Sequence, residues 1–108
     1  MNVLPEIVYS RRFDRDFSEI LRYLRQNISN QTADIIRDRI FEVIESLPEN
    51  PERFPPEPKL AYLGNYRVIR MKREPYKIFY RYTETEIRIA RIFHSKRDFD
   101  RIFRRYKF

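Results

Sequence analysis

Three segments with the composition of β-strands follow one another in the second half of the chain, separated by three residues each. They read YRVIRMK (66–72), YKIFYRY (76–82) and EIRIARIFH (86–94). Valine, isoleucine and aromatic residues are enriched in strands. The connections REP and TET are too short for a crossover, so neighbouring strands must run in opposite directions. The sequence therefore predicts a three-stranded antiparallel meander.

The third of these segments carries apolar residues on both of its faces. Strict alternation places Ile87, Ile89 and Phe93 on one face and Ala90, Ile92 and His94 on the other. A strand that is apolar on both faces is covered on both sides. One cover is expected from a C-terminal helix over about 97–106, through Phe99, Ile102, Phe103 and Tyr106.

The first half of the chain predicts a strand and two helices. The strand is EIVYS (6–10), and Ser10 is a suitable N-cap for the helix that follows. Apolar residues at helical spacing indicate helices over about 11–28 and 31–47. Their apolar faces are Phe13, Phe17, Ile20, Leu21, Leu24 and Ile28 in the first, and Ala33, Ile36, Ile40, Val43, Ile44 and Leu47 in the second. The short break NISN (27–30) makes them an antiparallel hairpin.

Between the hairpin and the meander, residues 48–58 hold five of the seven prolines. This segment is expected to be an extended loop, because proline disfavours both helix interiors and central strands. The order β-α-α-β-β-β-α predicts an α+β fold in which the helix hairpin packs on a small sheet. At 108 residues the chain is expected to form a single domain, 1–108.

The charge is distributed unevenly along the chain. Residues 1–66 contain 9 Lys and Arg against 11 Asp and Glu, whereas residues 67–108 contain 14 against 5, within a net charge of +7. This asymmetry favours an acidic partner for the C-terminal part, either nucleic acid or an acidic protein.

Several kinds of function are disfavoured by composition. Cysteine is absent and His94 is the single histidine, so we expect no transition-metal site and no cofactor. Ser95, the neighbour of His94, would point to the opposite side of a strand and is a poor partner nucleophile. No apolar run is long enough to span a membrane, and the first residues do not resemble a secretory signal. We expect a soluble, cytoplasmic protein.

Basic and aromatic residues alternate along the predicted strands. The cations are Arg70, Lys72, Lys77, Arg81, Arg88 and Arg91, and the tyrosines among them are Tyr66, Tyr76, Tyr80 and Tyr82. Proteins that bind single-stranded nucleic acid combine these residue types. The same residues also fill half-exposed strand positions because they pack well there. The pattern alone leaves both interpretations open.

His94 stands where the last strand ends, just before Lys96 and Arg97. It could fix the strand end by bonding to the backbone, contact a target, or transfer a proton, because its ordinary pKa is near neutrality.

The segment YRVIRMKREPYKIFYRYTETEIRIARIFHSKRDFDRIF resembles the C-terminal half of toxins of the RelE/ParE superfamily of type II toxin–antitoxin systems. The strand YKIFY, a turn, and an apolar strand that ends in FHSKRD carry the resemblance, and it is strongest to the ParE branch. The leading strand, the helix hairpin and the length are similar too. The resemblance implies a RelE/ParE-like fold over nearly the whole chain.

The resemblance implies two possible targets. ParE-like toxins poison DNA gyrase without nuclease activity, and RelE-like toxins cleave mRNA on the ribosome. The nuclease pattern would place Arg70, Lys77, Lys96, Arg97 and Tyr106 near catalytic positions. The chain departs from that pattern, because Lys77 stands where arginine is usual and Tyr106 is a few residues late. Gyrase poisoning without intrinsic catalysis is therefore favoured, with an mRNA interferase as the alternative.

The resemblance also implies a partner and a role in plasmid stabilisation. A cognate acidic, ParD-like antitoxin would neutralise the toxin, and a degenerate toxin that binds only its antitoxin is a third possibility. The residues expected to contact the target are Arg81, His94, Lys96, Arg97 and Arg101.

Overall fold

The computed structural model describes residues 3–105 and 108 of the chain. Its elements, in order, are β1 (Glu6–Tyr9), α1 (Arg11–Asn27), α2 (Asn30–Glu45), β2 (Arg67–Arg70), β3 (Tyr76–Tyr82), β4 (Glu86–His94) and α3 (Phe99–Arg105). Short 3₁₀ helices, Leu47–Glu49 and Pro58–Leu60, lie at the two ends of the proline-rich loop. The predicted order β-α-α-β-β-β-α is confirmed. Among the described residues, no helix is both long and apolar enough to cross a membrane.

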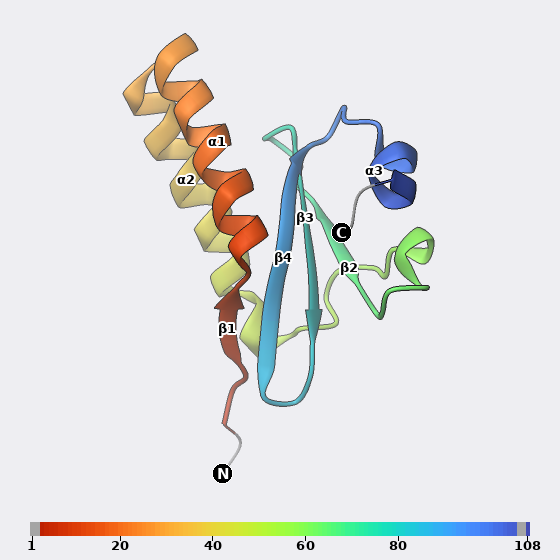
Figure 1. Cartoon of the computed structure of the whole chain (residues 1–108). Coiled ribbons are helices and arrows are strands. Elements are labelled where there is room, and N and C mark those ends of the chain that lie inside the picture. The colour runs from red at the N-terminus through yellow and green to blue at the C-terminus, as the bar shows by residue number, and fades with distance from the viewer. Residues whose placement is uncertain (1–2, 106–107) are drawn as a thin grey trace.

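The strands form one four-stranded sheet in the order β1-β4-β3-β2 (Figure 1). The β2-β3-β4 meander is antiparallel, as predicted. The N-terminal strand β1 lies parallel to β4, with Ile7 opposite Ile87 and Tyr9 opposite Ile89. This pairing joins the first and the last strand of the chain in one sheet, and it places the start of α1 beside the second half of β4.

Ser10 connects α1 to the sheet. Its hydroxyl oxygen accepts a hydrogen bond from the N–H of Phe13 at 3.0 Å and therefore caps the helix, as predicted. The same hydroxyl donates to the carbonyl of Ala90 at 2.7 Å. One side chain thus caps α1 and also bonds to the backbone of β4.

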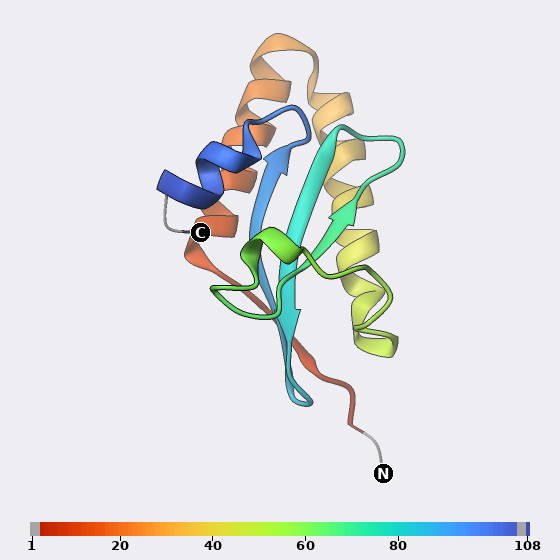
Figure 2. The same ribbon diagram turned by 90° about the vertical axis from the view of Figure 1, so that its right-hand side faces the viewer.

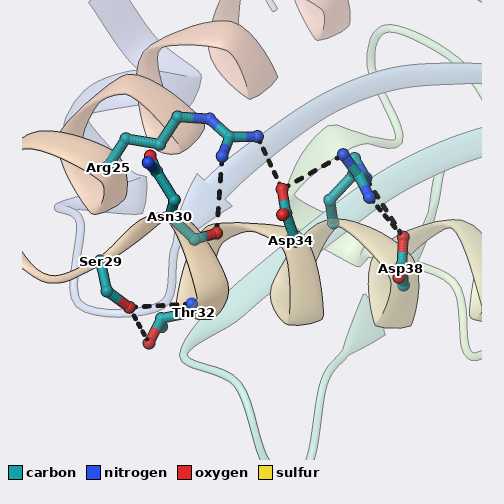
Figure 3. Close-up of polar contacts among 7 residues, drawn as sticks. Arg25, Ser29, Asn30, Thr32, Asp34 and Asp38 are labelled. Atoms are coloured by element: carbon teal, nitrogen blue, oxygen red, sulfur yellow. Dashed lines mark hydrogen bonds and ion pairs between the residues drawn. The ribbon is translucent and has the colours of Figure 1, made fainter.

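The turn between α1 and α2 is stabilised by polar contacts (Figure 3). Ser29 caps α2 by accepting from the N–H of Thr32 at 2.9 Å. Arg25 bonds to Asp34 at 2.9 Å, and so ties the last turn of α1 to the first turns of α2. Both side chains are more than a third exposed, so this ion pair contributes about 0–1 kcal/mol.

The helix hairpin covers one face of the sheet (Figure 1). The buried core between them, which we call the hairpin-side core, consists of Phe13, Phe17, Ile40, Ile44, Leu47, Ile69, Tyr76, Ile78, Tyr80, Ile87, Ile89 and Ile92. Most of the predicted apolar helix positions contribute to it or pack against it. Ile28 is an exception, because its side chain is 61% exposed just beyond the end of α1.

The third helix covers the opposite face, which also fits the prediction (Figures 1 and 2). A second cluster, which we call the α3-side cluster, consists of Leu60, Val68, Phe79, Phe93, Ile102 and Phe103, with Tyr66, Phe99 and Phe108 packed at its edge. Tyr106, expected to take part, lies outside the described residues. Aromatic rings dominate this cluster, whereas aliphatic side chains dominate the hairpin-side core.

The predicted faces of β4 are correct only for its first half. The register between β3 and β4 shifts between Phe79 and Tyr80, which lie opposite Arg91 and Ile89, so Ala90 is an extra residue. Such a bulge reverses the alternation beyond it. Ile92 therefore packs in the hairpin-side core with Ile89, and Phe93 packs on the α3 side. The prediction that Phe93 shares a face with Ile87 and Ile89 is wrong for this reason.

Candidate functional site

His94 ends β4 with an exposed side chain. Its Nδ1 accepts a hydrogen bond from the N–H of Lys96 at 3.2 Å, and its ring meets the ring of Tyr76 edge-on at 5.8 Å. The backbone bond orders the turn that leads to α3. Because the ring is exposed, it is also accessible to a partner. Among the described residues, no group of three or more possible ligands could hold a metal ion.

Three of the cations of the nuclease pattern lie around one depression. Arg70, Lys77 and Arg97 line a volume of about 380 Å³ beneath α3. Each of them already has a partner on the protein. Arg70 lies 3.4 Å from a carboxylate oxygen of Glu57. The ammonium of Lys77 lies 4.4 Å from the ring centre of Phe99, and the guanidinium of Arg97 lies 5.5 Å from that of Phe93.

Two polar contacts hold α3 over this depression. Lys59 pairs with Asp100 at 2.6 Å, and the hydroxyl of Tyr62 donates to the carbonyl of Phe103. The hydrogen bond and the charge of Lys59 hold the pKa of Asp100 below its ordinary value. The carboxylates of Asp98 and Asp100 also line the depression. An RNA phosphate in this position would meet Arg70 paired with Glu57, Lys77 stacked on Phe99, and a rim of mixed charge.

The expected target-contact residues do not form a single group. Lys96, Arg97 and Arg101 are exposed around the turn into α3, close in sequence to His94. Arg81 lies elsewhere, because it is opposite Arg88 near the other end of β3, whereas His94 is opposite Tyr76. The guanidinium of Arg81 stacks on Tyr66 at 5.4 Å.

The structure adds residues of α1 to the charged strand end. Arg12 and Arg15 line a depression of about 340 Å³ together with Arg91 and Arg97. We call this set the arginine depression. Its one carboxylate, Asp16, pairs with Arg91 through two bonds of 2.7 and 2.9 Å. Asp16 also accepts a hydrogen bond from the backbone N–H of Ile92 at 3.2 Å. It therefore provides an acceptor for the backbone of β4 at a position beyond the end of β1.

Arg12 and Arg15 were not predicted as site residues, because they belong to the half of the chain whose net charge is negative. The sequence nevertheless contains a feature that points to this cluster. Three arginines, Arg11, Arg12 and Arg15, stand in the first turns of a helix, where the macrodipole disfavours positive charge.

An apolar groove runs between the helix hairpin and the end of β4. Its volume is about 430 Å³, and its walls include Ile20, Tyr23, Ile28, Ile36 and Tyr76. Tyr23 and Ile28 are 62% and 61% exposed. The end of the groove at β4 is lined by His94 and Arg97. Large exposed apolar side chains along a groove are typical of a surface that binds another protein.

Comparison with known proteins identifies the family. A family model described as "ParE toxin of type II toxin-antitoxin system, parDE" matches residues 7–99. The chain belongs to the ParE toxin family. A comparison with curated proteins finds no match.

A chain in a solved structure of a ParDE system has a similar fold. The chain from the "Chromosomal ParDE TA system from P. aeruginosa" aligns with a TM-score of 0.70 at 18% identity, over 86% of this chain and 98% of that one. The match of the ParE family model confirms the resemblance to the ParE branch that was inferred from YKIFY and FHSKRD. The match to the ParE family model extends from β1 to Phe99, the first residue of α3. It includes the hairpin, all strands except the first residue of β1, and His94.

Proposed function

We propose that this ParE-family protein poisons DNA gyrase and is neutralised by a cognate antitoxin. The observation that favours gyrase over mRNA cleavage is the position of α3. It covers the sheet face on which a nuclease would need free cations, while Arg70 and Lys77 are paired with Glu57 and stacked on Phe99.

RNA cleavage would require an accessible acid and base. Each missing acid–base group typically lowers a rate by about 10² to 10⁴-fold. Of the candidates, Lys77 stacks on Phe99 of α3, Arg70 pairs with Glu57 although 53% of its side chain is exposed, and Lys96 is an exposed residue of the following turn. A toxin that acts by binding gyrase needs only a complementary surface, and the exposed corner formed by His94, Lys96 and Arg97 supplies one.

The proposed antitoxin segment would be acidic and would fold on binding. The apolar groove beside α1 and α2 provides a surface for the apolar face of such a segment, and the excess positive charge of residues 67–108 would attract it. Electrostatic attraction accelerates association and makes it sensitive to salt. Unchanged antitoxin affinity between low and high salt would contradict the electrostatic part of this proposal. Both gyrase and antitoxin would be met in the cytoplasm, which is the compartment we propose.

A direct assay separates the possible targets. With purified gyrase and supercoiled DNA, the protein should inhibit supercoiling and increase the amount of cleaved DNA. In a translating extract it should leave mRNA intact. Cuts at ribosomal A sites would instead support the interferase alternative, for which the common location of Arg70, Lys77 and Arg97 is the favouring observation. Inactivity in both assays, with tight antitoxin binding, would indicate a degenerate toxin.

A double variant tests the exposed corner. Lys96→Ala with Arg97→Ala should change the free energy of unfolding by less than about 0.5 kcal/mol per residue, because both side chains are exposed. Toxicity on induced expression should nevertheless fall. Lys72→Ala with Arg73→Ala, in the β2–β3 turn, removes the same charge from exposed positions and should remain toxic. A fully toxic Lys96/Arg97 variant would remove this corner from the target surface.

A further inference from the structure

We propose that the arginine depression binds the phosphodiester backbone of duplex DNA directly and without reading sequence. The site combines Arg12 and Arg15 of α1 with Arg91 of β4 and Arg97 of the turn before α3. This is a DNA contact of the chain itself, so it goes beyond the proposed action on gyrase and can be measured without that enzyme.

The first support is the number of guanidinium groups that have no counter-ion. Arg12 and Arg15 are exposed and make no hydrogen bond or ion pair within residues 3–105 and 108. Arg97 stacks on Phe93 but makes no ion pair in that part of the chain. Asp16, the one carboxylate of the depression, is engaged by Arg91 through two hydrogen bonds. Three positive charges therefore face the depression uncompensated.

The second support is that Arg12 and Arg15 stand where positive charge does not favour folding. Arg12 and Arg15 lie in the first turns of α1, where the helix dipole is positive and acidic residues are the stabilising choice. Like charges gathered from α1, β4 and the following turn also repel one another. An anion in the depression would relieve both effects, and it would be attracted by the helix terminus as well.

The chemistry of the surface favours a phosphate backbone over an acidic peptide. The apolar residues that line the depression, Phe93 and Ile102, are only 5% and 4% exposed, so a peptide could bury little apolar area there. One guanidinium group can form two parallel hydrogen bonds with the oxygens of one phosphate. The release of counter-ions from nucleic acid then supplies affinity without apolar contacts. The apolar groove, lined by Ile20 and Ile36, is the surface suited to a peptide.

The test is the salt dependence of DNA binding. Fluorescence anisotropy of a labelled duplex of arbitrary sequence is measured between about 50 and 200 mM salt, where phosphate contacts dominate the dependence. For Arg12→Gln with Arg15→Gln, the slope of log K against log salt should become less steep by about 1.8, and affinity at 0.1 M salt should fall on the order of 10- to 100-fold. Lys72→Gln with Arg73→Gln is the charge-matched control and should bind like the parent protein.

The outcomes are distinct. The proposal would be overturned if the salt slope of DNA binding were unchanged in the Arg12/Arg15 variant. It would also be overturned if the Lys72/Arg73 control lost as much DNA affinity as that variant. Tighter binding to poly-glutamate than to duplex DNA would reassign the depression to an acidic peptide, and tighter binding to single-stranded RNA would reject DNA as the ligand. Gyrase poisoning with no direct DNA binding would overturn this inference alone. Direct DNA binding through Arg12 and Arg15 without gyrase poisoning would support it and contradict the proposed function.

Discussion

The two faces of the sheet are covered by different kinds of side chain. The face under α1 and α2 is mainly aliphatic, and Ile40, Ile44 and Leu47 are fully buried there. The face under α3 is aromatic and ringed by cations such as Lys77, which stacks on Phe99, and Arg97, which stacks on Phe93. The contrast indicates that the hairpin side supplies most of the stability. The α3 side carries exposed positive charge, which is where binding of an anionic partner is expected.

The largest effect should come from a truncation within the hairpin-side core. Ile44→Ala removes a fully buried side chain of α2 and should lower the free energy of unfolding by about 2–5 kcal/mol. Ile35→Ala is the matched control, because the same residue type on the same helix is 44% exposed. Urea denaturation measures both. Equal losses would mean that the hairpin does not dominate stability as the burial pattern indicates.

The next largest effect is expected at the ion pair that joins Asp16 of α1 to Arg91 of β4. Asp16→Asn removes the charge that binds Arg91, and the two side chains are only 12% and 15% exposed. Because hydrogen bonds to charged groups contribute about 1.5–3 kcal/mol, we expect a loss of that size in unfolding experiments. Asp34→Asn, which disrupts the exposed pair with Arg25, should cost about 1 kcal/mol or less. A smaller loss for Asp16 than for Asp34 would contradict this account.

Alkaline pH should lower the free energy of unfolding through tyrosines of the hairpin side. Burial raises the pKa of Tyr9, Tyr76 and Tyr80 above the ordinary value of 10.0, and all three rings pack in or against the hairpin-side core. Above about pH 10 the unfolded chain releases these protons while the folded chain retains them, so the free energy of unfolding falls as pH rises. Tyr80→Phe should make the fall shallower in urea titrations at several pH values. An equally steep fall would exclude Tyr80 as a cause.

The smallest effect is expected at the charged strand end. His94 is exposed and accepts one backbone hydrogen bond from Lys96, so His94→Ala should change the free energy of unfolding by no more than about 0.5 kcal/mol. Thermal melting and growth inhibition are measured together. A stable variant with reduced toxicity would assign His94 to target contact. A loss above 1 kcal/mol would instead make it a structural residue of the turn.

Much of the fold could be predicted because it depends on local pattern. Helical spacing located α1 and α2 to within two residues, and the short connections fixed the β2-β3-β4 meander. Ser10 was identified as a helix cap from its position alone. Such features depend on neighbours in sequence, and local backbone preferences determine them.

The parallel pairing of β1 with β4, the bulge at Ala90 and the arginine depression were decided by tertiary structure. Each depends on residues distant in sequence. The bulge is located by the β3–β4 register, and it moves Phe93 to the α3 face, where Arg91 and Arg97 stack on it. The β1–β4 pairing carries Arg12 and Arg15 to that same strand end. The sequence therefore determined the elements and the excess of positive charge. Only the packing of α1 against β4 decided where that charge gathers, because the distance between side chains on different elements is set by long-range contacts.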